Sequence, residues 1–161
     1  MRRSLRKGAL AAAIFLPVLG GGAVMAGQEQ GGKDRIEGVW DVRVTNVQCD
    51  TGAATTTSRG YLMYGPGGRF TSIGINPPNS LATGTLGTWR HLRGQSYTAA
   101  DIRFIFNADG SLAEIVKVTR EIELSTNANE YTNTATTEVF SASDQLISTG
   151  CATATATRLF E

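Results

Sequence analysis

Apolar and polar residues alternate along most of the chain from Ile36 onward, which is the period of a half-buried β-strand. No stretch of convincing length in this part shows the three-to-four-residue period of an amphipathic helix. Threonine is abundant there, and β-branched residues favour strands over helices. The pattern predicts eight strands, over residues 36–48, 57–64, 69–75, 83–92, 97–106, 112–124, 130–140 and 146–159.

Short polar segments separate these predicted strands. The clearest are GPGG at residues 65–68, NADG at 107–110 and STNAN at 125–129, whose residue types are typical of tight turns. The loop at residues 76–83 is longer and contains two prolines, which cannot join a hydrogen-bonded ladder. Because short turns join antiparallel neighbours, the strands form a meander, and closing it removes two exposed edges. We therefore expect an all-β fold, an eight-stranded antiparallel up-and-down barrel, with a two-sheet β-sandwich as the alternative.

The N-terminal residues have a different pattern. Four basic residues among the first seven precede an apolar run and then small residues, the order typical of a secretory signal peptide. We place the signal peptide at residues 1–26, a polar glycine-rich leader at 27–35 and a single β-barrel domain at 36–161. Pro17 and three glycines interrupt the run and argue against a stable membrane span, although a retained anchor and twin-arginine export stay open. The expected location is secreted or periplasmic.

Loss of the signal peptide changes the charge of the chain. The full sequence has 15 Lys and Arg against 14 Asp and Glu, a formal net charge of +1. Four of the 15 basic residues leave with residues 1–26, so the predicted mature chain has 11 against 14 and a net charge of −3. Its arginines are scattered rather than grouped in a stripe, so no nucleic-acid partner is expected.

Both cysteines, Cys49 and Cys151, lie in the predicted mature chain. An even number in an oxidising compartment predicts a disulfide, with two free buried thiols as the alternative. The bond would close a loop of about 100 residues, which is worth roughly 4–5 kcal/mol in the chain-entropy model. If the last strand pairs with the first and the cysteines lie opposite each other, Val42 faces Arg158. This pairing would close the barrel.

Extending the hairpins from their turns assigns the two faces of the later strands. One face is mostly apolar and is expected to point into the barrel, whereas the other, with Asp101, Arg103 and further charged residues, is expected to face solvent. On the last strand, Ala152, Ala154 and Ala156 alternate with threonines, and we place the alanines inside. The residues predicted to line a ligand cavity are Ile102, Phe104, Phe106, Glu114, Val118, Arg120, Tyr131 and Asn133.

The segment Gly38-Val39-Trp40 resembles the Gly-x-Trp sequence that opens the barrels of lipocalins and related calycins. In those families an arginine late in the last strand packs across the tryptophan and closes the barrel, and Arg158 is the matching residue here. The segments GTWR, NADG, TREIELS and GCATATATR also resemble a set of uncharacterised secreted bacterial β-barrel proteins, over most of the predicted mature chain. The resemblance implies a calycin-like barrel closed by Trp40 and Arg158. Two features of typical lipocalins, a Thr-Asp-Tyr motif and a helix after the last strand, are not found.

Little else in the sequence indicates catalysis or a cofactor. We interpret the single histidine, His91, as a solvated side chain near a strand end, with an axial haem ligand as the alternative. One histidine and two cysteines expected in a disulfide do not make a zinc site, and no metal or cofactor is expected. No glycine-rich phosphate loop leads from a strand into a helix, and no residue is predicted to be catalytic.

Arg120 is the residue of greatest functional interest. A cation inside a barrel needs a partner, because burying it alone is costly. The partner is either an internal acid such as Glu114 or the carboxylate of a fatty-acid-like ligand. Three hypotheses follow: a barrel that binds a small hydrophobic or amphipathic molecule, a packed structural or interaction barrel whose loops contact a partner, and a lipid cyclase or isomerase. The last requires Glu114, Arg120 and Asn133 to share one pocket, and the oligomeric state is left open.

Overall fold

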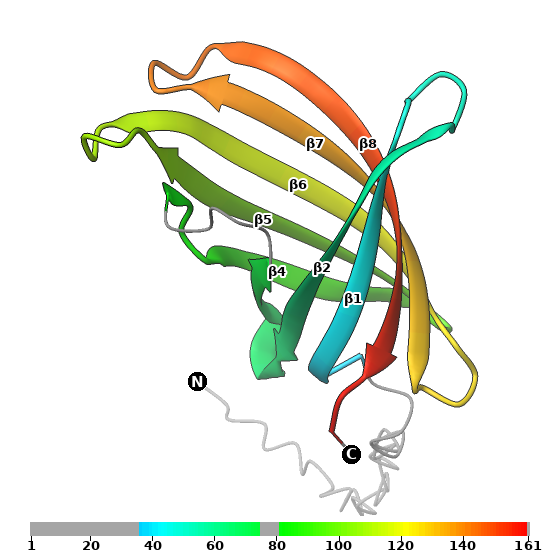
Figure 1. Ribbon diagram of the computed structural model, residues 1–161. Helices are drawn as coiled ribbons and strands as arrows, with labels where there is room; N and C mark the ends of the chain where they lie inside the picture. The colour runs from blue at the N-terminus through cyan, green and yellow to red at the C-terminus, as the bar shows by residue number, and fades with distance from the viewer. Residues whose placement is uncertain (1–35, 75–80, 161) are drawn as a thin grey trace, which may run out of the picture.

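The computed structural model of the protein describes residues 36–74 and 81–160. The predicted signal peptide at 1–26, the leader at 27–35 and most of the loop at 76–83 lie outside these residues. The described chain forms eight antiparallel strands, each hydrogen-bonded to the next, and the last strand pairs with the first to close a barrel (Figure 1). The fold is therefore the predicted up-and-down barrel and not the sandwich.

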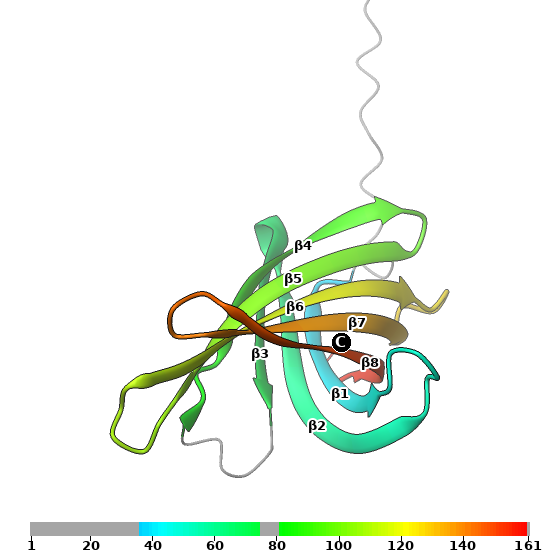
Figure 2. The same ribbon diagram turned by 90° about the horizontal axis from the view of Figure 1, so that it is seen from above.

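The strands lie close to their predicted positions, and the largest difference is at the start of the second strand. Strands five to eight are long and curve around the barrel (Figure 1). The hairpin of strands four and five and the hairpin of strands one and two stand on opposite sides of strands six to eight (Figure 2). The strands are β1 (Gly38–Val47), β2 (Ala54–Gly65), β3 (Arg69–Gly74), β4 (Thr85–Arg93), β5 (Ser96–Phe106), β6 (Leu112–Leu124), β7 (Glu130–Ser141) and β8 (Leu146–Arg158).

The GPGG segment is the hairpin turn between β2 and β3, as predicted. Gly67 and Gly68 have φ angles of 73° and 77°, in the left-handed region that favours glycine. A Cβ atom on Gly68 would lie 2.8 Å from the carbonyl oxygen of Trp89. The missing side chain therefore allows the turn to approach β4 closely.

The predicted disulfide between Cys49 and Cys151 is present and connects the β1–β2 loop to β8. The register of β1 and β8 differs from the predicted one by two residues, because Arg158 lies opposite Trp40 itself. The reason is that Cys49 lies beyond the end of β1, and the residue opposite Cys151 is Val47. A shift of two residues keeps the same side chains facing inward. The three alanines of β8 are accordingly buried, as predicted.

A β-bulge makes the register between β5 and β6 differ from the predicted one. Near the turn Phe106 pairs with Leu112, as expected. The next pair joins Ile105 to Glu114, so Ala113 is the extra residue on β6. One extra residue moves every later side chain of the partner strand to the other face.

The bulge reverses the predicted faces of β5. Asp101 is only 6% exposed and pairs with an inward-facing arginine, and Arg103 lines the interior. Both residues were expected to face solvent. Ile102 and Phe104 were expected inside, but Phe104 is 38% exposed and Ile102 shares its outward face. The prediction for this strand was wrong, whereas the predicted register of β6 with β7 is confirmed.

Trp40 and Arg158 close one end of the barrel, as predicted. The guanidinium carbon of Arg158 lies 4.3 Å from the centroid of the Trp40 ring, a cation–π contact. The Nη1 atom of Arg158 donates a hydrogen bond to the carbonyl of Glu37 at 2.6 Å, and Nε donates to the carbonyl of Ala128 at 2.9 Å. Arg158 therefore joins three segments of the chain at this end.

Gly38 makes this arrangement possible. Its φ of +138° is one that side-chain-bearing residues rarely adopt, and a Cβ atom there would collide with Nη1 of Arg158. The indole Nε1 of Trp40 donates a hydrogen bond to the carbonyl of Ile36 at 2.9 Å, which fixes the ring from the other side. The glycine and the tryptophan of the Gly-x-Trp segment thus both contribute to the packing of Arg158 against this end of the barrel.

Aromatic side chains fill the part of the interior next to this closed end. The rings of Trp40 and Tyr131 meet edge to face with centroids 4.8 Å apart, and Tyr64 lies 4.9 Å from Phe70. Such pairs stabilise a core by roughly 0.5–1.5 kcal/mol beyond the burial of their surface. We call this cluster the aromatic floor, and it consists of Trp40, Tyr64, Phe70, Trp89, Tyr97 and Tyr131. In the described part of the chain no helix has the length and apolar character to cross a bilayer.

Candidate functional site

A cavity of about 200 Å³ lies inside the barrel, and the aromatic floor contributes nothing to its wall. Inward-facing residues from seven of the strands surround it. Its apolar side is formed by Val42, Val44, Leu62, Val118, Ala135, Ala152 and Ala154. Its polar side is formed by Asn46, Ser58, Ser72, Arg103, Arg120, Asn133 and Thr137. The cavity is therefore amphipathic.

Arg120 points into the barrel, as predicted, and it has a structural partner. Its Nη1 atom forms an ion pair with Oδ2 of Asp101, whose side chain is fully buried. Its guanidinium carbon also lies 5.1 Å from the centroid of Phe70. Burial lowers the pKa of Arg120, opposed by Tyr64 and Tyr131, but an arginine stays protonated in proteins. The charge of Arg120 is thus compensated by Asp101 and not by Glu114.

Arg103 is the second arginine of the cavity wall, and sequence reasoning missed it. Among the described residues it forms no ion pair, and its buried Nε has no hydrogen-bond partner. The Oδ1 atom of Asp101 is likewise buried without a partner there. Arg59, at the rim, is held by two hydrogen bonds of 2.8 and 2.6 Å to Asp41. The wall therefore carries one positive charge, on the half-buried Arg103, that forms no ion pair within the described chain.

The structure brings only part of the predicted ligand set together. Val118, Arg120 and Asn133 line the cavity. Tyr131 belongs to the aromatic floor, where it is 2% exposed. The remaining predicted residues lie outside the cavity wall. The bulge at Ala113 explains the outward position of the three on β5, Ile102, Phe104 and Phe106, whereas Glu114 lies on β6 next to the bulge.

The position of Glu114 bears on the isomerase hypothesis. Glu114 lies next to the bulge, opposite Ile105 and Ser141, and does not border the cavity. It therefore does not share a pocket with Arg120 and Asn133, which that hypothesis required. One signal for the polar side of the cavity was present in the sequence. Asp101 and Arg103 are charged residues at alternate positions of β5, and one of them could neutralise an inward arginine.

His91 lies at the end of β4 and is exposed. Its Nε2 atom is 2.8 Å from the carbonyl oxygen of Gly94, and its ring lies 4.8 Å from the centroid of Tyr97. It does not line the interior cavity. No group of three or more His, Cys, Asp or Glu side chains within residues 36–74 and 81–160 is arranged to hold a metal ion.

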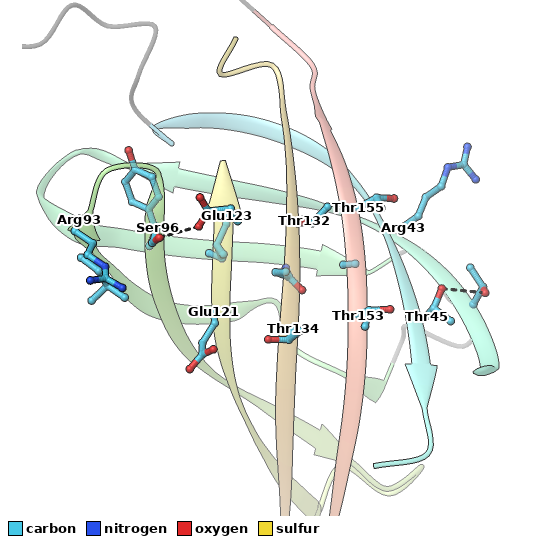
Figure 3. Close-up of a pocket in the computed structure, with 16 residues that line it drawn as sticks. Arg43, Thr45, Arg93, Ser96, Glu121, Glu123, Thr132, Thr134, Thr153 and Thr155 are labelled. Carbon is cyan, nitrogen blue, oxygen red and sulfur yellow. Dashed lines mark hydrogen bonds between the residues drawn. The ribbon is translucent and has the colours of Figure 1, made fainter. Parts of the chain in front are cut away.

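A second hollow of about 870 Å³ lies on the outer surface of the barrel (Figure 3). We call it the outer groove. Its base is formed by outward-facing residues of β6, β7, β8 and β1, and the β4–β5 hairpin borders one side. Threonine is its most frequent lining residue, at positions 45, 57, 132, 134, 153 and 155.

Comparison of the sequence with models of protein families and with curated proteins finds no match to either.

Proposed function

We propose that the protein is an exported, lipocalin-like barrel that binds a small amphipathic anion in its interior cavity. The observation that carries this proposal is the guanidinium of Arg103 in the cavity wall, which forms no ion pair and whose Nε has no hydrogen-bond partner among the described residues. Arg103 is half-buried, and its buried Nε atom has no hydrogen-bond partner in the described chain, which is unfavourable unless a ligand provides one. A carboxylate of the ligand would provide that partner, while the valines and alanines of the opposite wall would contact its apolar part.

The size of the cavity limits the ligand. Pockets for drug-sized molecules are about 300–1,000 Å³. The interior cavity, about 200 Å³, lies below that range. A short carboxylate therefore fits better than a long-chain fatty acid. The residue proposed to bind the carboxylate of the ligand is Arg103 and not Arg120, the residue of the sequence-based hypothesis. Arg120 is already paired with Asp101, whereas Arg103 forms no ion pair in the described chain.

Two other parts of the proposal, that the protein is exported and that it is lipocalin-like, rest on separate observations. The basic and apolar N-terminal segments are typical of a signal peptide, and a disulfide is typical of proteins that leave the reducing cytosol. The Trp40–Arg158 contact is similar to the closure of calycin barrels. Together they support a secreted or periplasmic binding protein.

Two measurements test the proposal. Native mass spectrometry of the protein isolated after export should reveal a small co-purifying anion. Calorimetric titration of ligand-free protein should show that hexanoate binds and that hexanol, which has no charge, binds much more weakly. Arg103→Met should weaken hexanoate binding about ten-fold or more, since a hydrogen bond to a charged group is worth roughly 1.5–3 kcal/mol. Arg90→Met, an exposed arginine on β4, is the matched control and should change nothing.

The aromatic floor favours one alternative, a packed barrel that acts through its surface. A mass equal to that of the bare mature chain, together with no binding of hexanoate or hexanol, would support that alternative. Unchanged hexanoate binding in Arg103→Met would instead place the ligand elsewhere.

A further inference from the structure

The outer groove and the interior cavity lie on opposite faces of the same strands, with Asn133 and Ala154 bordering both. Leu92, Arg93 and Ser96 of the β4–β5 hairpin form one wall, and Thr57 of β2 lies at the opposite end. The outward-facing residues between them point into the hollow from four neighbouring strands (Figure 3). The groove therefore runs across the strands rather than along them.

Side chains in the groove form two cross-strand rows. The first row, from β6 to β2, is Glu121, Thr134, Thr153, Thr45 and Thr57. The second row, two residues further along each strand, is Glu123, Thr132, Thr155 and Arg43. Neighbouring strands are ~4.8 Å apart, so the first row is about 19 Å long.

The threonine hydroxyls of these rows are available to a ligand. Thr132, Thr134, Thr153 and Thr155 are exposed, and their side chains make no hydrogen bond to the described part of the chain. Only at the end of the first row are two hydroxyls close, with 3.5 Å between the Oγ1 atoms of Thr45 and Thr57. Each hydroxyl both donates and accepts, so the rows match a ligand that itself carries many hydroxyl groups.

The charges of the groove balance. Glu121 and Glu123 lie near Arg93 at one end, and Arg43 lies at the other (Figure 3). None of these four side chains forms an ion pair within residues 36–74 and 81–160. Ser96 donates a hydrogen bond to Oε2 of Glu123 at 2.7 Å. With two charges of each sign, the groove favours neither a polyanion nor a polycation.

Other occupants fit the groove less well. An extended peptide binds a sheet through a free edge, and the barrel is closed. A second copy would place one concave face on another and leave a gap between them. An apolar molecule would leave the rows of hydroxyls without hydrogen-bond partners.

We propose that the outer groove binds a neutral oligosaccharide chain lying across the strands. A sugar ring spans about one strand interval, so the first row would accommodate roughly four rings. The threonine hydroxyls exchange hydrogen bonds with the sugar hydroxyls, and the carboxylates of Glu121 and Glu123 accept from them. The threonine methyl groups and Leu92 contact the apolar faces of the rings.

The test is titration of the folded protein with cellotetraose, chitotetraose and maltotetraose, followed by calorimetry and NMR. At least one should bind, and Thr134→Val with Thr153→Val should weaken it about ten-fold, because two hydrogen bonds are lost while the side-chain shape stays the same. Thr134→Ser keeps the hydroxyl and should retain binding. Thr136→Val and Thr149→Val, exposed on the same two strands outside the groove, are matched controls.

Three results would overturn the proposal. The first is that none of the three tetrasaccharides binds at millimolar concentration. The second is that binding is unchanged in the Thr134→Val, Thr153→Val variant when far-ultraviolet circular dichroism shows a native fold. The third is that an acidic oligogalacturonate binds more tightly than every neutral chain. Hexanoate binding in the interior should be unaffected by these variants, so the two sites are tested separately.

Discussion

The aromatic floor and the interior cavity are built by the same strands of one barrel, yet one is filled and the other is hollow. Around the closed end, inward positions carry large rings such as those of Trp40 and Tyr64, both at most 1% exposed. Around the cavity, inward positions carry small side chains, such as Ala135, Ala152 and Ala154. An eight-stranded barrel is just wide enough for side chains to fill it, so residue size alone decides between the two outcomes.

The polar groups of the two regions differ in the same way. At the aromatic floor, the Trp40 indole and the guanidinium of the adjoining Arg158 have backbone carbonyl partners. At the cavity, Nε of Arg103 and Oδ1 of Asp101 are buried without partners in the described chain. Buried polar groups without partners reduce stability, and proteins retain them mainly where they serve a function. The polar groups of the floor are therefore satisfied within the barrel, whereas the cavity wall contains buried polar atoms that the described chain leaves without partners.

The largest expected effect is from truncation in the aromatic floor. Trp40→Ala should lower the free energy of unfolding by about 3–5 kcal/mol, because it removes a fully buried ring and leaves a void. Val118→Ala at the cavity should cost only about 1–2 kcal/mol, since that side chain already borders empty space. Urea denaturation measures both. Equal costs would contradict the division between floor and cavity.

A second prediction concerns the two ion pairs. Asp101→Asn leaves Arg120 buried without its counter-charge and should destabilise the fold by about 3–5 kcal/mol. Asp41→Asn breaks the pair with Arg59, whose side chain is 47% exposed, and should cost about 0–1 kcal/mol. The same denaturation experiment compares them. A small effect of Asp101→Asn would mean that water or another group compensates Arg120.

The barrel and its closed end could be predicted from local patterns. Alternation fixed the strands, and the turn residues fixed their antiparallel order. The two-residue error in the register of β1 and β8 did not change which side chains were predicted to face inward, because side chains alternate with a period of two along a strand. The single extra residue at Ala113 made the prediction for β5 wrong, because it reversed the inward and outward faces of that strand. Asp101 and Arg103 were therefore not predicted to face the interior. No local signal marks such a bulge in a long alternating strand, and the volume left inside depends on how all eight strands pack.

Alkaline pH should test the aromatic floor specifically. Burial raises the pKa of Tyr64 to about 12, opposed by the hydrogen bond with Tyr131 and by the charge of Arg120, and burial also raises that of Tyr131. A raised pKa means that the native state keeps a proton which the unfolded chain releases above pH 10. Stability is therefore complete below pH 10 and falls as pH rises toward 12.

The expected loss over that window is roughly 2–3 kcal/mol, at about 1.4 kcal/mol per pKa unit. Tyr64→Phe should make the loss clearly smaller, whereas Tyr61→Phe, on the outer face of the same strand, should leave it unchanged. Urea midpoints measured at intervals of pH give the curve. A stability that is constant up to pH 12 would contradict the burial of the Tyr64 phenol.

The smallest expected effect distinguishes the two arginines of the cavity wall. Arg120→Met leaves Asp101 buried and unpaired, and should cost about 3–5 kcal/mol. Arg103→Met removes a cation that forms no ion pair in the described chain and replaces it with an apolar side chain. The free energy of unfolding should therefore change by less than about 1 kcal/mol. A slight gain in stability would be consistent with this, because a buried N–H group without a partner in the described chain is removed. If Arg103→Met instead destabilises the barrel as much as Arg120→Met, Arg103 has a structural role. Its charge would then be no reason to expect an anion in the cavity. The aromatic floor and the cavity would in that case differ only in the size of their inward side chains.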